Sequence, residues 1–271
     1  MKSNFILHWG EGCGEVTTMT FPAGEVNVTL PKGVKGNRIL VEAFIRDSDG
    51  VMALALIKDA INHIKEINPE VLLVMGYTPY LQQDRVCNQG EALSAKVFCT
   101  MVNNMGFDKV EILDPHSDVG PAVLNNCEIL TQSDVVGRWF NNQHPYDALV
   151  SPDFGATKKT QKLAKQLNYE VIQGVKDRNL QTGELTGFNY YGDVEGKNLL
   201  IVDDICVGGG TFIGLAEKLK AGGARSIDLY VSHGIFSNGV ELLLDNGIDH
   251  IYTTNSFTKG IDHPKLTIIA I

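Results

Sequence analysis

The stretch from Asn198 to Phe212, NLLIVDDICVGGGTF, decides the fold of this chain. Its first five residues are almost wholly apolar and β-prone, which is typical of a parallel strand covered on both faces. Asp203 and Asp204 follow this expected strand at 198–202, and three consecutive glycines come soon after. From Thr211 onward, apolar residues recur at helical spacing and predict a helix over 211–221. The unit is therefore a strand, an acidic pair, a glycine-rich loop and a helix.

The glycine-rich loop has the features of an anion cradle. The glycines at 208–210 allow the backbone to approach a ligand closely, and the first N–H groups of the following helix point toward that ligand. Asp203 and Asp204 would repel a phosphate by themselves, so we expect them to bind hydroxyls, a metal ion or both. A phosphorylated sugar offers hydroxyls and phosphate together. The alternative is an ordinary strand-to-helix turn that Thr211 caps.

Two common phosphate loops do not match this stretch. No Lys-Ser/Thr follows the glycines, as a Walker A loop requires, and the dinucleotide spacing G-x-G-x-x-G is also missing. The stretch instead resembles the phosphoribosyl-pyrophosphate loop of type I phosphoribosyltransferases, a hydrophobic strand followed by Asp-Asp, two residues and Asp-Thr-Gly-Gly-Thr. Val207 stands where that superfamily has a third acidic residue, and Gly208 where it has a hydroxyl. The resemblance implies that a sugar phosphate binds these residues: Asp203, Asp204, Cys206, Val207, Gly208, Gly209, Gly210 and Thr211.

Composition limits the class of protein. The 271 residues are 44% hydrophobic and 20% charged, as in an ordinary globular chain, and the formal net charge is −9. That charge argues against a nucleic acid or an anionic membrane as the main partner. The five cysteines are odd in number and lack Cys-x-x-Cys spacing, which disfavours both a zinc site and a disulfide framework. With no long apolar run, we expect a cytoplasmic protein.

Strands and helices alternate along the chain, which predicts an α/β fold with mainly parallel sheets flanked by helices. The expected strands lie at 4–9, 25–30, 38–45, 71–75, 109–113, 148–151, 169–173, 198–202, 226–232, 249–252 and 265–270. The expected helices lie at 51–67, 92–105, 133–142, 157–167, 211–221 and 237–246. The two halves repeat one layout at an offset of roughly 120 residues. We therefore expect two tandem domains, 1–132 and 133–271.

Several further segments, taken as a set, resemble the ribose-phosphate pyrophosphokinase family over nearly the whole chain. They are Phe-Pro-Ala-Gly-Glu-Val at 21–26, Pro-Tyr-Leu-Gln-Gln-Asp-Arg at 79–85, Leu-Ser-Ala-Lys at 93–96, Asp-Pro-His at 114–116, Ser-Pro-Asp-Phe-Gly-Ala at 151–156, and Lys176 with Arg178. The resemblance implies two phosphoribosyltransferase-like domains, the first on the ATP side and the second on the sugar-phosphate side. It also implies self-association into a homo-oligomer.

The resemblance assigns a role to each matching position. It implies that ATP is bound by Phe21, Glu25, Gln82, Gln83, Asp84, Arg85, Asp114 and His116. It implies that Mg²⁺ is ligated at His116 and Asp153, and that Arg85, Lys176 and Arg178 are catalytic. The implied reaction moves the β,γ-diphosphoryl group of ATP to the anomeric 1-hydroxyl of ribose 5-phosphate, and AMP leaves.

Charge considerations agree with these roles. Negative charge builds around the β-phosphorus during the transfer, so positively charged donors should surround it. Lys176 and Arg178 lie two residues apart on an expected loop after the strand at 169–173, from which they could close over the site. Simpler roles stay open for three of these positions. The basic pair could be a solvated surface pair, His116 could be structural, and Asp153 could cap the helix expected from 157.

Departures from the family pattern concern both ATP and the acceptor. Gln82 replaces an arginine that contacts ATP in the family, and Ala23 replaces an Asp or Asn of the nucleotide-binding segment, so ATP binding could be altered. Val207 and Gly208 leave more room near the 5-phosphate, which could admit ADP-ribose. A divergent phage branch of the family, the ADP-ribose pyrophosphate synthetases of NAD metabolism, acts on that substrate. A phosphoribosyltransferase and a non-catalytic regulatory protein that associates with a synthetase are the competing functions.

Overall fold

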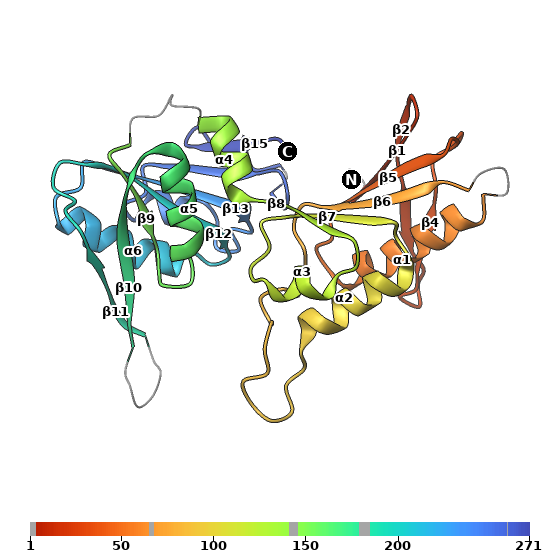
Figure 1. Ribbon diagram of the computed structural model, residues 1–271, viewed down its shortest axis with the longest axis horizontal. Helices are drawn as coiled ribbons and strands as arrows, with labels where there is room; N and C mark the ends of the chain where they lie inside the picture. Colours follow the sequence, from red (N-terminus) through yellow and green to blue (C-terminus); the bar gives the residue numbers. More distant parts are fainter. Residues whose placement is uncertain (1–3, 65–67, 141–145, 179–184, 259) are drawn as a thin grey trace. The chain divides into compact units, whose positions relative to one another are not determined.

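The computed structural model describes residues 4–64, 68–140, 146–178, 185–258 and 260–271. The chain divides into two compact units, Met1–Leu130 and Thr131–Ile271, and this division falls two residues before the expected one. Each unit is a mainly parallel sheet flanked by helices, as the alternating pattern predicts, and Figure 1 shows the helices of the N-terminal unit along one face of its sheet. Among the described helices, none combines the length and the apolar character needed to cross a membrane.

The N-terminal unit is built on a six-stranded sheet with the order β2-β1-β5-β6-β7-β8. Strands β5 to β8 are parallel, whereas β1 runs antiparallel to both of its neighbours. The strands are β1 (Phe5–Trp9), β2 (Gly12–Glu15), β5 (Arg38–Ala43), β6 (Glu70–Met75), β7 (Lys109–Leu113) and β8 (Cys127–Leu130). A separate hairpin comprises β3 (Thr17–Thr20) and β4 (Val26–Thr29), and the helices are α1 (Ser48–Asn62), α2 (Ser94–Met105) and α3 (Val119–Val123).

The C-terminal unit is built on a seven-stranded sheet with the order β11-β10-β9-β12-β13-β14-β15. All neighbours are parallel except β10 and β11, which form an antiparallel hairpin. The strands are β9 (Ala148–Ser151), β10 (Glu170–Arg178), β11 (Leu185–Tyr191), β12 (Asn198–Cys206), β13 (Ser226–Gly234), β14 (His250–Thr254) and β15 (Leu266–Ile269). The helices are α4 (Gln132–Phe140), α5 (Thr157–Leu167), α6 (Gly210–Ala221) and α7 (Glu241–Leu244).

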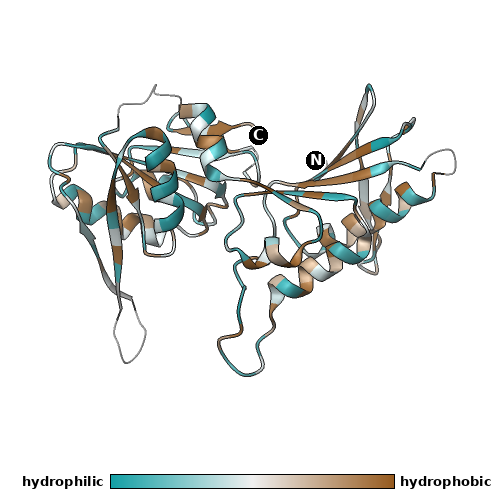
Figure 2. Ribbon diagram, in the orientation of Figure 1, coloured by the Kyte–Doolittle hydropathy of each residue, from teal (hydrophilic) through white to brown (hydrophobic). Residues whose placement is uncertain are grey.

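Burial explains why the apolar runs form the central strands. Residues Leu199–Val202 of β12 are at most 1% exposed, since β12 has strands on both sides and helices over the sheet. In the N-terminal unit, Val71, Leu73 and Met75 of β6 enter the hydrophobic core. Figure 2 shows hydrophobic residues along the strands and hydrophilic ones in loops and along parts of the helices. The strands thus bury the apolar surface and leave their polar ends available.

Several boundaries differ from the sequence-based expectation. The strand expected at 169–173 continues to Arg178, because β11 supplies an antiparallel hydrogen-bonding partner that the local pattern does not reveal. The loop expected to carry Lys176 is therefore a strand. Strand β12 likewise continues through the acidic pair to Cys206, alongside β13. The first helix begins at Ser48 rather than 51, because Asp47 accepts a hydrogen bond from the Gly50 N–H at 2.8 Å.

Helix α1 ends at Asn62 rather than 67, and residues 65–67 of that expectation lie outside the described residues. Apart from shifts of one or two residues, the remaining differences are omissions and one further shortened helix. The helix expected at 237–246 is reduced to α7, Glu241–Leu244, since a turn occupies the residues before it. The elements that the sequence pattern did not predict are β2, β3, β8, β11 and α3. They are short or lie at sheet edges. Such strands form because distant segments supply hydrogen-bonding partners, and their own sequences show no strong local pattern.

Candidate functional site

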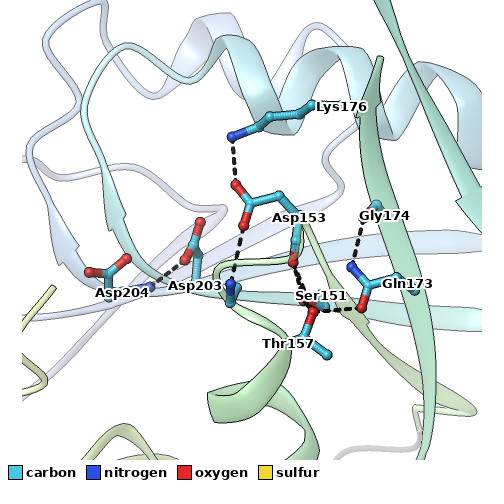
Figure 3. A network of polar contacts seen from close by, with 9 residues as sticks. Ser151, Asp153, Thr157, Gln173, Gly174, Lys176, Asp203 and Asp204 are labelled. Atoms are coloured by element: carbon cyan, nitrogen blue, oxygen red, sulfur yellow. Dashed lines mark hydrogen bonds and ion pairs between the residues drawn. The ribbon is translucent and has the colours of Figure 1, made fainter. Parts of the chain in front are cut away.

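Polar side chains gather where the parallel strands of the C-terminal unit end. Register pairs Ile201 of β12 with Val150 of β9, and Asp203 with Val231 of β13, so these strands end at one edge of the sheet. Ligands of open α/β sheets bind at this carboxyl edge. Figure 3 shows the resulting group, with Asp153 beside Lys176 and with Asp203 and Asp204 alongside.

Asp153 is held from two sides. Its Oδ2 lies 2.6 Å from Lys176 Nζ, and its Oδ1 accepts a hydrogen bond from the Ala156 N–H at 3.1 Å, just before α5 (Figure 3). Burial alone would raise the pKa of Asp153, but the Lys176 ammonium and backbone N–H groups hold that pKa below its ordinary value. Asp153 is thus an ionised carboxylate, and it binds the N–H of Ala156, the N-cap residue of α5, without supplying a side-chain cap to the helix.

Asp203 and Asp204 form a close acidic pair. The Asp204 N–H donates to Asp203 Oδ1 at 2.9 Å, and Lys159 Nζ lies 4.0 Å from Asp204 Oδ2. Burial and the negative charge of Asp204 raise the pKa of Asp203. Gln132 Nε2 donates to the Asp203 carbonyl at 2.7 Å and fixes this part of β12. An acidic pair in which one carboxyl keeps a proton more readily can both donate to and accept from sugar hydroxyls.

Residues 207–209, named here the cradle loop, connect β12 to α6. Helix α6 begins at Gly210, and Gly209 is its N-cap, with a φ of +85° and no side-chain cap hydrogen bond. The interpretation of Thr211 as the cap is therefore wrong, because Thr211 is already the second residue of the helix. A Cβ at Gly210 would meet nothing within 4 Å, so open space borders the start of the helix. Val207 is 43% exposed.

Cys206 ends β12 and is buried. Burial and the negative charge of Asp203 raise the pKa of its thiol to about 12. A thiol with that pKa remains protonated near neutral pH, so it is a poor nucleophile. Cys206 therefore acts through packing and through its backbone rather than through its sulfur.

The N-terminal unit brings three of the expected ATP-binding residues together. Arg85 contacts both carboxylate oxygens of Asp84, with Nε to Oδ1 at 2.7 Å and Nη2 to Oδ2 at 3.2 Å. The Arg85 hydrogen bond is the largest of the effects that lower the pKa of Asp84, and Ser117 and the charge of His116 add to it. The Arg85 side chain is 76% exposed, so its guanidinium can still reach an anion. Its position fits a nucleotide phosphate contact.

The remaining expected ATP-binding positions are more dispersed. Phe21 and Glu25 lie in the exposed turn between β3 and β4, where the Phe21 N–H donates to the Glu25 carbonyl at 2.8 Å. Gln82 is exposed, whereas Gln83 accepts from Ser94 Oγ at 2.5 Å and holds the loop against the start of α2. Asp114 is only 2% exposed, with a left-handed φ of +35°. Gln83 and Asp114 are therefore placed to shape the loops.

The expected catalytic pair Lys176 and Arg178 lies on strand β10. Arg178 is the last residue of β10, opposite Leu185, but its side chain lies outside the described residues. Lys176 lies two residues earlier on the same strand, and an irregularity between Asp177 and Arg178 interrupts the regular pairing with β11. The basic pair is therefore carried by a strand, as the Lys176 contact with Asp153 indicates.

The structure adds polar residues that the sequence motifs did not assign. Thr157 Oγ1 donates to Gln173 Oε1 at 2.7 Å, and Ser151 Oγ donates to the Asp153 carbonyl at 2.8 Å (Figure 3). Lys159 adds a positive charge beside Asp204. The sequence predicted α5 correctly, and Lys159 lies in its first turn, just after the end of β9. That position could have identified Lys159 as a candidate site residue.

The donor set fits a metal–nucleotide complex better than a free metal ion. Within the described ranges, no three His, Cys, Asp or Glu side chains gather closely enough to hold an ion by themselves. Mg²⁺ usually binds proteins through one or two carboxylates and completes its shell with water and substrate phosphates. Asp153, ionised and partly exposed, suits that arrangement. In the N-terminal unit, the side chain of His116, the other expected ligand, is exposed.

Two family models match the chain. The phosphoribosyl transferase domain matches residues 128–263, and the N-terminal domain of ribose phosphate pyrophosphokinase matches residues 6–106. Together they cover both units.

Curated proteins and one solved structure resemble this chain over most of its length. The ribose-phosphate pyrophosphokinase of Pyrococcus furiosus is 30% identical over 258 residues, which are 92% of this chain and 88% of that protein. The enzyme of the same name from Sulfurisphaera tokodaii is 28% identical over 262 residues, covering 95% and 89%. The crystal structure of phosphoribosylpyrophosphate synthetase from Mycobacterium smegmatis shares the fold, with a TM-score of 0.80 at 22% identity over 94% of this chain and 85% of that one.

Proposed function

This chain belongs to the ribose-phosphate pyrophosphokinase family, and we propose that it transfers the β,γ-diphosphoryl group of ATP to the 1-hydroxyl of ribose 5-phosphate. The observation that carries the proposal is the Lys176–Asp153 ion pair beside Asp203, Asp204 and the cradle loop. This edge of the sheet combines a cation for phosphate, an acidic pair for hydroxyls and a helix start for a second phosphate. A 5-phosphorylated sugar and a nucleotide need all three.

The acidic pair and the cradle loop would hold the sugar phosphate. Asp203 and Asp204 would bind ring hydroxyls, and burial strengthens such hydrogen bonds because water competes less. The first N–H groups of α6 would bind the 5-phosphate, since they lack partners within the helix and carry the positive end of its dipole. The sugar is then fixed at two ends, with its 1-hydroxyl directed at the nucleotide.

The cationic side chains would stabilise the transfer. The oxygen of the 1-hydroxyl would attack the β-phosphorus and release its proton to water. The bond from that phosphorus to the oxygen bridging it to the α-phosphate would break, and AMP would leave with the bond electrons. Lys176 would pair with the diphosphate once that anion competes with Asp153 for the ammonium, and the exposed Arg85 would contact the nucleotide phosphates. Arg178 would act beside Lys176. Donors placed in advance cost no rearrangement during the reaction.

Asp153 in the C-terminal unit and His116 in the N-terminal unit are each proposed as a Mg²⁺ ligand, with ATP phosphates completing the shell. When bound, the ion neutralises phosphate charge. Asp153 keeps its carboxylate ionised through the neighbouring ammonium and N–H groups, which suits it to a cation. In the N-terminal unit, the exposed ring of Phe21 would pack on the adenine, with Glu25, Gln82, Gln83, Asp84 and Asp114 shaping the nucleotide site.

ADP-ribose is a second candidate acceptor. Val207 is exposed and the Gly210 position borders open space, so a 5-phosphate that carries a further nucleotide could extend past the helix start. Ribose 5-phosphate remains the first candidate because the similar proteins are named for it. The two acceptors share the ribosyl 1-hydroxyl and the first phosphate.

The deciding experiment is AMP release from ATP and Mg²⁺, followed by chromatography, with ribose 5-phosphate and ADP-ribose offered separately. AMP with ribose 5-phosphate supports the first acceptor, and AMP with ADP-ribose alone assigns the second. AMP with neither acceptor contradicts the proposal and favours a regulatory protein that binds nucleotide without turnover. A phosphoribosyltransferase would instead release pyrophosphate only with a nucleobase and phosphoribosyl pyrophosphate, which a parallel assay would detect.

Self-association is proposed from the family resemblance. Sedimentation velocity of the intact chain at several concentrations would measure it, with a single monomer species contradicting it.

A further inference from the structure

The carbonyl oxygens of Cys206, Val207 and Gly208 accept hydrogen bonds from one neighbouring segment. Residues 235–238, named here the bracket segment, follow β13 and run beside the loop. The N–H groups of Ile235 and Phe236 donate to the Cys206 carbonyl at 2.9 and 3.2 Å. The Ser237 N–H donates to the Val207 carbonyl at 2.9 Å. Three consecutive carbonyls, the third being that of Gly208, are thus bound from the same side.

Two side chains complete this set of contacts. Ser237 Oγ donates to the Val207 carbonyl at 3.1 Å, and Asn238 Nδ2 donates to the Gly208 carbonyl at 3.1 Å. Asn238 also limits what position 208 can carry, because a Cβ added at Gly208 would lie 3.2 Å from Asn238 Nδ2. The glycine and the asparagine amide therefore fit each other.

Peptide geometry sets the direction of the N–H groups. In a planar trans peptide, the C=O of one residue and the N–H of the next point in opposite directions. Because the carbonyls of Cys206, Val207 and Gly208 face the bracket segment, the N–H groups of the cradle loop face away from it. They then join the first N–H groups of α6 in lining the space that a phosphate would enter.

The bracket segment is itself anchored. Thr254 Oγ1 and Ser256 Oγ donate to the Ser232 carbonyl at 2.6 and 3.0 Å, and Thr258 Oγ1 donates to the Gly234 carbonyl. These hydroxyls are buried and fix the end of β13, from which the bracket segment continues. A fixed support can transmit its geometry to the loop, whereas a mobile one could not.

We propose that Ser237 and Asn238 are positioning residues for phosphate recognition, because they hold the Val207 and Gly208 carbonyls so that the cradle loop presents its N–H groups to the anion. The identity of that anion as a sugar 5-phosphate rests on the proposed function. Their contribution would appear in affinity for phosphate and in KM for the sugar phosphate. KM for ATP and kcat would change little, since neither side chain contacts the nucleotide in this assignment.

The test uses the intact chain with Asn238→Leu, which keeps the side-chain size but removes the donor, and with Ser237→Ala. Calorimetric titration with inorganic phosphate and with ribose 5-phosphate should give a Kd raised about five- to tenfold for Asn238→Leu, as expected for one hydrogen bond. Ser237→Ala should weaken binding less, because its backbone N–H still donates. Ser237→Thr, which keeps the hydroxyl, should restore affinity.

The matched control is Asn246→Leu. Asn246 Nδ2 donates to the Leu242 carbonyl at 2.8 Å in α7, the same kind of contact at another backbone carbonyl. Unchanged Kd in Asn238→Leu, or equal weakening in the control, overturns the proposal even if AMP release proceeds normally. Binding of neither phosphate by the wild-type chain also overturns it. Weakened binding in a chain that releases no AMP supports the positioning role and contradicts the proposed function instead. Thermal melting confirms that each variant is folded.

Discussion

The two units support their strand-end loops by different means. In the C-terminal unit, backbone and side-chain donors of the neighbouring bracket segment hold the carbonyls of 206–208. In the N-terminal unit, the longer loop after β6 is held largely by its own side chains. Glu91 accepts from the N–H groups of Cys87 and Asn88 at 2.9 and 3.0 Å. The cradle loop is therefore held by the bracket segment that packs against it, whereas the loop after β6 is held by solvent-exposed charged side chains.

Because of this difference, we expect the two loops to respond differently to substitutions, pH and salt. A loop braced against a neighbouring segment tolerates no added atoms, since each new atom must displace a packed neighbour. A loop held by exposed carboxylates tolerates added atoms better but responds to pH and salt, which act on charges at the surface. The following expectations run from the largest effect to the smallest.

The largest effect is expected at Lys176, the cation inside the candidate site. Lys176→Ala should lower kcat/KM for AMP release by about 10²- to 10³-fold, the range for losing one preorganised electrostatic donor. Lys197→Ala is the control, because Lys197 also contacts a carboxylate, Glu170, at 3.2 Å, and its side chain is 23% exposed against 24% for Lys176. Similar losses in both variants would mean that the site has been placed wrongly.

An intermediate effect is expected at Gly209. Alanine there must adopt a φ of +85°, at a cost of roughly 1–2 kcal/mol, and its Cβ would lie 2.9 Å from Leu243 Cδ2. We expect lower unfolding stability in urea and a higher KM for ribose 5-phosphate. Gly196→Ala separates the two causes, because Gly196 has a φ of +68° but nothing within 4 Å of an added Cβ. A raised KM in both variants would contradict the close-packed account of the cradle loop.

The smallest effect is expected at Glu91. Hydrogen bonds from Asn88 and Cys87 lower the pKa of Glu91, so the folded carboxylate binds protons less readily than the unfolded one. Its contribution is therefore present above the ordinary glutamate pKa and is lost as the pH falls through the lowered value. Hydrogen exchange of the amides of 83–91, corrected for intrinsic rates, should show that protection decreases as the pH is lowered through this interval.

Glu91→Gln provides the comparison for this pH effect. The variant should show less protection of 83–91 at neutral pH and little further change on acidification. Equal pH dependence in both proteins would show that another group orders the loop.

Most of the fold could be predicted from the sequence, because strong local patterns define the central strands and helices. The runs at 109–113, 148–151 and 157–167 match β7, β9 and α5, since apolar spacing and end signals agree there. Helix α2 ends at Met105, as expected, and Gly106 follows it in the left-handed conformation with a φ of +72°. The strand character of Lys176 was not predictable locally, because it depends on pairing with β11 across intervening residues.

Much of the candidate site followed from motif spacing, but its support did not. Asp153, Lys176, Asp203 and Asp204 meet because parallel strands end at one edge, a consequence of the predicted topology. Ser237 and Asn238 lie in a turn whose sequence has no phosphate-binding motif, and their role depends on hydrogen bonds to carbonyls about 30 positions earlier. Only the three-dimensional register of β12 and β13 reveals it.

The central claim is that the loop of the C-terminal unit binds the sugar phosphate and the loop after β6 binds the nucleotide. Amide chemical shifts of the ¹⁵N-labelled chain test it most directly. Ribose 5-phosphate and a non-hydrolysable ATP analogue with Mg²⁺ would be titrated separately into the intact protein. The account predicts that ribose 5-phosphate shifts the amides of 207–211 and leaves 82–91 nearly unchanged, whereas the nucleotide shifts 82–91. Shifts from ribose 5-phosphate at 82–91 without any at 207–211 would contradict it.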